Sequence, residues 1–169
     1  MAGSRLAGKV AIVTGAGSRA EGIGNGRAAA VLFAREGARV LCVDRSGAAA
    51  EATRAMIASE GGEAAVLEAD VTRSEDCRAM VEETLRRWGR LDVLDNNVGI
   101  GGRATVVEVD EADWDHLMRV NVTSMMLACK HAIPAMARGG GETAARKVQQ
   151  IEQVVANDDV AIPGPRVVR

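Results

Sequence analysis

VAIVTGAGSRAEGIGNG, residues 10 to 26, is the stretch that decides the fold of this chain. It opens with a short apolar run, Val10 to Val13, and continues through glycines at positions 15, 17, 22, 24 and 26. A helical pattern follows from Arg27 to Glu36 and stops at Gly37, so the order predicts a strand, a glycine-rich turn and a helix. The unpaired N–H groups and positive dipole end of such a helix favour phosphate or pyrophosphate, with a tight structural turn as the alternative.

Length and composition indicate one folded domain of 169 residues, 47% of them hydrophobic, with two Trp, one Phe and no Tyr. The core is therefore expected to be aliphatic. A net charge of −2 favours neither nucleic acid nor an anionic membrane as partner. The start, MAGSRLAGK, is too short and polar for a signal peptide, and no apolar run is long enough to span a membrane. Buried free thiols in a reducing cytoplasm are expected of Cys42, Cys77 and Cys129.

The rest of the chain alternates apolar runs with helical patterns. Strand-like runs cover 39–44, 64–69 and 91–96, and helical patterns cover 48–59, 72–88 and 110–134. This alternation predicts an α/β fold in which helices cover both faces of a parallel sheet, with strand order 3-2-1-4 and the ligand beside the first strand. Thr72 and Glu75 have capping-box spacing. One face of that helix is apolar, at Cys77, Met80, Val81, Thr84, Leu85 and Trp88.

Residues 1–141 are predicted to form a Rossmann-type domain, and residues 142–169 a divergent helix and tail. The long helical pattern begins with an acidic cluster at Glu108, Asp110, Glu111, Asp113 and Asp115, which suits a helix N-terminus better than a metal site. His116 and His131 lack partners at ligand spacing, so surface or capping roles are expected and no metal is predicted.

Several of these motifs, in this order, resemble the short-chain dehydrogenase/reductase family over about residues 6–141. Thr14 and Gly15 with Gly22, Ile23 and Gly24 look like the TGxxxGxG turn, with three extra residues between Gly15 and Gly22. The NNAG motif is matched by residues 96–99, and the adenine-contacting pair by Asp70 and Val71. The resemblance implies binding of a nicotinamide dinucleotide by Gly15, Ser18, Gly22, Ile23, Gly24, Asp44, Arg45, Asp70, Val71, Asn97 and Gly99. It also makes Asn121 a candidate catalytic residue, as the Asn of the family's tetrad.

Asp44 indicates which dinucleotide is preferred. It lies at the end of the second strand, 20 residues after Gly24, where a carboxylate can accept hydrogen bonds from both ribose hydroxyls of NAD and would repel the extra phosphate of NADP. Arg45 beside it favours that phosphate, so NADP remains the less favoured alternative. A solvated strand end is the structural alternative for Asp44.

The second half of the family pattern is missing from the sequence. The family's hydride chemistry uses a Ser and a YxxxK pair about 40 residues after the Asn, whereas this chain contains no Tyr and reads Ile162 to Arg166 there. The segment after Gly141 has no strand ending in Ser-Ser, and Lys147 has no catalytic partner on its helix. The chain is therefore expected to be a truncated oxidoreductase relative that is inactive alone. If a fifth strand is absent, the fourth is an edge and Asp95 reaches water.

Two alternatives to an oxidoreductase remain open. One is a non-catalytic nucleotide-binding or interaction protein that pairs with an intact homologue, and the other is a frameshifted product without a role. The helix over 110–137 is the expected contact for a homo-oligomer or a homologue, because the resemblance implies packing between subunits there. Its apolar side chains are Trp114, Leu117, Met125, Met126 and Ile133.

Overall fold

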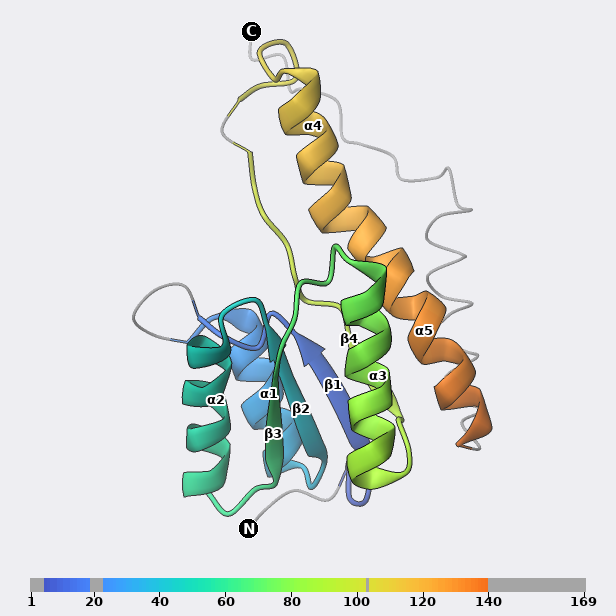
Figure 1. Cartoon of the computed structure of the whole chain (residues 1–169). Helices are drawn as coiled ribbons and strands as arrows, with labels where there is room; N and C mark the ends of the chain where they lie inside the picture. Colours follow the sequence, from blue (N-terminus) through green and yellow to red (C-terminus); the bar gives the residue numbers. More distant parts are fainter. Residues whose placement is uncertain (1–4, 19–22, 103, 140–169) are drawn as a thin grey trace, which may run out of the picture.

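The computed structural model describes residues 5–18, 23–102 and 104–139, and these form an α/β fold. Four strands alternate with helices up to the last strand. Three consecutive helical elements, α4, η1 and α5, then complete the described chain and are called the helical arm (Figure 1). The elements are β1 (Val10–Thr14), α1 (Asn25–Arg35), β2 (Arg39–Asp44), α2 (Gly47–Ser59), β3 (Ala64–Glu68), α3 (Ser74–Trp88), β4 (Val93–Asp95), α4 (Glu111–Met118), the π-helical turn η1 (Arg119–Thr123) and α5 (Ser124–Arg138).

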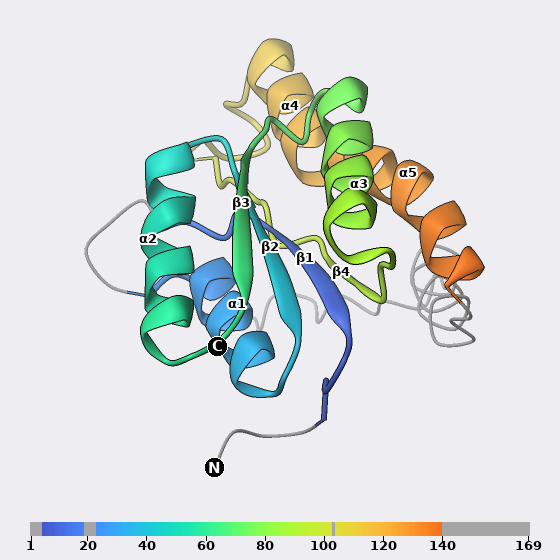
Figure 2. The same ribbon diagram turned by 60° about the horizontal axis from the view of Figure 1, so that its bottom comes forward.

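The sheet is parallel with the order β3-β2-β1-β4, which confirms the predicted topology. In the central pair Val10 lies opposite Arg39, and on the other side Ala11 lies opposite Val93. Helices α1 and α2 cover one face, and α3 and α5 cover the other (Figure 2). Because the strands are parallel, the loops that follow β1, β2, β3 and β4 all lie at the carboxyl edge of the sheet, where the strands end.

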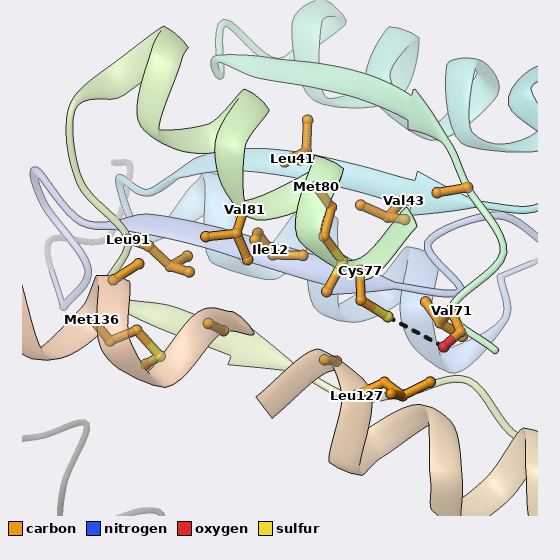
Figure 3. Close-up of a cluster of buried hydrophobic side chains, with 14 of the residues drawn as sticks. Ile12, Leu41, Val43, Val71, Cys77, Met80, Val81, Leu91, Leu127 and Met136 are labelled. Carbon is orange, nitrogen blue, oxygen red and sulfur yellow. Dashed lines mark hydrogen bonds between the residues drawn. The ribbon is translucent and has the colours of Figure 1, made fainter. Parts of the chain in front are cut away.

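Each face of the sheet has its own aliphatic core. Beneath α3 and α5, the buried side chains include Ile12, Leu41, Met80 and Leu127 (Figure 3). Beneath α1 and α2 they include Val13, Val40, Ala30 and Ile57. Every residue of β1 is buried, as expected for a strand covered on both faces. The apolar face predicted for α3 is confirmed, with Cys77, Met80, Val81 and Thr84 buried.

Several predicted boundaries differ from the structure. The first helix starts at Asn25 instead of Arg27, and the fourth strand is only Val93–Asp95. The predicted capping box of Thr72 and Glu75 is not formed. The Thr72 hydroxyl instead donates to Asp70 Oδ1 at 2.7 Å, and α3 begins at Ser74. The last helix runs through Pro134 to Arg138, since burial of the neighbouring side chains outweighs the missing backbone donor.

The helical arm begins where the acidic cluster predicts it. Asp110 caps α4, with its Oδ1 accepting from the Asp113 backbone N–H at 2.7 Å. Among the described residues β4 pairs with β1 alone, so it is the edge of this sheet, and Asp95 is half-buried there. The predicted segment 142–169 lies outside the described residues.

Candidate functional site

A cavity of about 1040 Å³ lies at the carboxyl edge of the sheet, where all four strands end. Its walls come from the loops after β1, β2, β3 and β4, together with His116 and Val120 of the helical arm. Such an edge, next to the point where the strand order reverses, is where open α/β sheets bind ligands. Most of the predicted binding residues line it, namely Gly15, Ser18, Gly24, Asp44, Arg45, Asp70, Val71, Asn97 and Gly99.

The glycine-rich turn brings the start of α1 against the end of β1. Gly15 has φ +65°, a left-handed conformation that favours glycine. A Cβ at Gly26 would collide with the Gly15 carbonyl oxygen and with the Asn97 side chain. Gly24 precedes α1 in an extended conformation and caps it with no side-chain hydrogen bond. Among the described residues no side chain caps this helix start, so its first N–H groups can face a ligand in the cavity.

Gly26 is the residue of this turn that the sequence interpretation missed. It lines the cavity and is buried, whereas Ile23 is 66% exposed and is not among the lining residues. Gly22 lies outside the described residues. The available signal was the last GxG of the turn, Gly24-Asn25-Gly26, which stands directly before the helical pattern.

Asp44 is fixed at the end of β2 by two backbone donors. Its Oδ2 accepts from the Gly17 N–H and its Oδ1 from the Ser46 N–H, both at 2.9 Å. A Cβ at Gly17 would lie 2.8 Å from the same Oδ2, so the glycine permits this approach. The carboxylate lines the cavity with lone pairs still available to ligand hydroxyls, and Arg45 lines it beside Asp44.

The segment after β3 is held by its own hydrogen bonds. Asp70 Oδ1 accepts from the Thr72 N–H at 2.9 Å and from its hydroxyl, while the Asp70 N–H donates to Asp76 Oδ2 at 2.8 Å. Partial burial raises the pKa of Asp70, but the Thr72 bonds and the charges of Arg45 and Arg73 outweigh it and lower the pKa overall. Asp70 is thus an ionised carboxylate at neutral pH.

Asn97 ties the loop after β4 to the end of β1. Its Nδ2 donates to the carbonyls of Thr14 and Gly15 at 3.1 and 3.2 Å, and its backbone N–H donates to the Thr14 hydroxyl. These bonds place Val98 and Gly99 in the cavity wall beside the glycine turn.

Asn121, the predicted catalytic residue, is half-buried in η1 and pairs with the backbone of Ile100. Its Oδ1 accepts from the Ile100 N–H and its Nδ2 donates to the Ile100 carbonyl, both at 2.8 Å. Both polar atoms of this side chain therefore hold the loop after β4 against the helical arm. This arrangement positions the cavity wall, and a role in catalysis stays a prediction.

The remaining candidates lie at separate places. His116 is exposed at the cavity, whereas His131 Nε2 lies 2.9 Å from the Ser74 hydroxyl and links α5 to α3. The three cysteines are free thiols, and burial raises the pKa of Cys42 to about 12 and that of Cys77 to about 11. No group of three metal-binding side chains occurs within the part of the chain that the structure describes. That part also contains no helix long and apolar enough to cross a membrane.

A search against family models matches residues 9–146 to the short chain dehydrogenase family. The chain therefore belongs to the short-chain dehydrogenase/reductase family, whose members are oxidoreductases that bind NAD or NADP. An uncharacterized oxidoreductase of Thermotoga maritima is 42% identical over 134 residues, which cover 79% of this chain and 51% of that protein.

Another relative and a solved structure agree with this assignment. The 2-(S)-hydroxypropyl-CoM dehydrogenase 3 of Xanthobacter autotrophicus is 40% identical and matches over 79% of this chain and 50% of its own length. A short chain dehydrogenase of Mycobacterium smegmatis superposes with a TM-score of 0.74 at 36% identity, covering 80% of this chain and 55% of that one. The chain thus spans about half the length of the relatives it matches.

Proposed function

We propose that the cavity at the carboxyl edge of the sheet binds a nicotinamide adenine dinucleotide. The observation that carries the proposal is the close approach of Gly26 to Gly15, which brings the start of α1, with its glycine N-cap, to the cavity. The start of α1 would hold the pyrophosphate, Asp44 and Asp70 would hold the adenosine half, and Asn97 and Gly99 would line the nicotinamide half. When bound, the cofactor supplies hydride chemistry between nicotinamide and a carbonyl or alcohol.

The preferred cofactor in this proposal is NAD. Two backbone N–H groups hold the Asp44 carboxylate in place, so it accepts hydrogen bonds from the adenosine ribose hydroxyls without reorganising. The same charge repels a 2′-phosphate. Arg45 offers partial compensation to NADP, which makes the preference one of degree.

Calorimetric titration of the purified chain with NADH and NADPH tests both points. We expect the chain to bind NADH more tightly than NADPH. Asp44→Asn is expected to reduce this preference for NADH by about tenfold, because it removes a charge-assisted acceptor. Glu82→Gln is the matched control, since Glu82 is exposed on α3 and pairs with Arg78. Equal affinity for the two cofactors contradicts the preference, and no binding at millimolar concentration contradicts the site itself.

For catalysis, we propose that this chain alone holds the dinucleotide and transfers no hydride. It contains no Tyr to exchange the proton, and both polar atoms of Asn121 are engaged with Ile100. A positioned acid–base group is typically worth about 100- to 10,000-fold in rate. A panel of ketones followed by NADH absorbance is the test. Turnover that survives purification and disappears in Asn121→Ala contradicts this proposal.

A second candidate function is association through the helical arm. Trp114, Met118, Val122 and Met126 recur every four residues, and all four are exposed. An apolar stripe of this kind favours packing against another subunit, either a second copy or an intact homologue. If the chain is a frameshifted product without a role, neither association nor cofactor binding is expected.

We propose a cytoplasmic location for the protein, since its three cysteines are free thiols.

A further inference from the structure

The turn η1 touches both walls of the cavity through three consecutive residues. Arg119 donates from a guanidinium nitrogen to the Thr72 carbonyl at 2.6 Å, on the wall that follows β3. Asn121 makes its reciprocal pair with Ile100 at 2.8 Å, on the wall that follows β4. Between them Val120 is buried and lines the cavity. One short turn is therefore bonded to two segments that lie on opposite sides of the glycine turn.

Helix geometry explains how one turn reaches two walls. Residues two positions apart do not share a face of a helix, so Arg119 and Asn121 project in different directions. The π-helical turn is an uncommon conformation that occurs often at functional sites. Both contacts go to backbone atoms, so they constrain the path of the wall segments directly.

The wall after β3 is a place where an added contact matters. Thr72 is half-buried and lines the cavity. The segment before it is held because Asp70 Oδ1 accepts from the Thr72 N–H and the Asp70 N–H donates to Asp76 Oδ2. These bonds fix Asp70, but they leave the Thr72 carbonyl to a partner from outside the segment. Arg119 supplies that partner from 47 residues further along the chain, with a charged donor.

We infer that η1 is a strap that fixes the separation of the two cavity walls, and that Arg119 is a positioning residue for the adenosine half of the dinucleotide. The inference rests on the proposed function, since it assumes that the dinucleotide lies in this cavity. Arg119 acts through Thr72 and the path of residues 70–72, whereas Asn121 acts through Ile100 on the nicotinamide half. Two residues of one turn thus act on different halves of the ligand, Arg119 on the adenosine half and Asn121 on the nicotinamide half.

Two fragments of the cofactor test this division, namely adenosine monophosphate and nicotinamide mononucleotide, titrated by NMR into the whole chain. Arg119→Ala is expected to weaken the binding of adenosine monophosphate and of NADH by about three- to tenfold, the usual worth of one charge-assisted hydrogen bond at an exposed site. Binding of nicotinamide mononucleotide stays within about twofold. Arg119→Lys, which keeps the charge but loses the planar fork, is expected to fall between the wild type and Arg119→Ala. Lys130→Ala removes a charge from an exposed position on α5 and serves as the control.

Three results overturn the inference. Unchanged binding of adenosine monophosphate by Arg119→Ala shows that the strap does not position this wall. Equal losses for both fragments, together with a lower thermal midpoint, show a purely structural role. Equal losses in Arg119→Ala and Lys130→Ala show that only net charge matters. If the wild type binds NADH and any of these occurs, the strap fails alone, whereas a wild type that binds no dinucleotide removes the proposed function as well.

Discussion

Helices α3 and α4 both begin with an acidic first turn but lie in different environments. Both carry two acidic residues in the first turn, at Glu75 and Asp76 in one and Glu111 and Asp113 in the other. Yet α3 lies along the sheet and buries four side chains, whereas α4 extends beyond the sheet and buries none (Figure 1). Local signals thus determine where a helix forms, and a neighbouring element determines whether its apolar face is buried.

The largest difference between the two helices is expected from the same substitution made in each. Met80 on α3 is fully buried, so Met80→Ala is expected to lower the free energy of unfolding by about 2–5 kcal/mol. Met118 on α4 is exposed, so Met118→Ala is expected to change it by under about 0.5 kcal/mol. Urea denaturation followed by circular dichroism measures both. Equal losses would mean that the described surface of α4 is covered in solution.

Glycines provide a second contrast between close-packed and open positions. Gly26→Ala forces a Cβ into the Gly15 carbonyl, which is expected to cost about 1–3 kcal/mol of stability and to abolish dinucleotide binding. Gly101→Ala is the control, because a Cβ there meets nothing within 4 Å. Thermal denaturation and NADH titration of both variants provide the comparison. A Gly26→Ala variant that still binds NADH normally would contradict the close approach on which the site depends.

The exposed apolar side chains of α4 and α5 lead to a prediction about association. We expect the wild type to form oligomers or to show poor solubility, and Trp114→Glu with Met126→Glu to weaken association by at least about tenfold, or 1.4 kcal/mol. Trp114 is 50% exposed and Met126 similarly so, so the monomer fold is expected to tolerate both changes. Light scattering across a concentration series measures the effect. A wild type that is monomeric at high concentration counts against the stripe as an interface.

The sequence predicted the features that depend on local signals, and it did not predict those that depend on contacts between distant segments. The alternation of apolar runs was sufficient for the sheet order, because right-handed crossovers leave few topologies. The wall residues Asp44, Asp70 and Asn97 were predictable, since each lies at or just after the end of a strand-like apolar run. Gly26 was not assigned, because its close approach depends on where α1 begins. The bonds of Arg119 and Asn121 were not predicted, since they join segments 47 and 21 residues apart.

The smallest expected effect concerns pH and lies in the packed half of the molecule. Asp92 accepts from the Val10 N–H at 2.9 Å and pairs with Arg90 and Lys9. Burial raises the pKa of Asp92, but the Arg90 and Val10 hydrogen bonds and both cations outweigh it, so the pKa is lowered in the folded state. Its stabilising contribution is therefore present above the unfolded pKa of about 3.9 and is lost as pH falls through the lower folded value.

Asp92→Asn tests this effect. We expect the wild type to lose stability as the pH falls below about 4, and the variant to lose less over that range, by roughly 1 kcal/mol or under. Urea denaturation at a series of pH values between 2 and 7 measures both curves. Parallel curves for the two proteins would show that Asp92 does not contribute to the acid sensitivity.

The most direct test of the dinucleotide site is a map of amide chemical shifts in the isotopically labelled chain during titration with NADH. We predict saturable shifts in the loops that follow the four strands, at Gly15, Gly17, Asp44, Val71 and Gly99, with none at the exposed apolar residue Leu32 on α1. Absence of shifts at millimolar NADH, or shifts confined to surfaces away from the carboxyl edge of the sheet, would contradict the assignment of this cavity as the dinucleotide site.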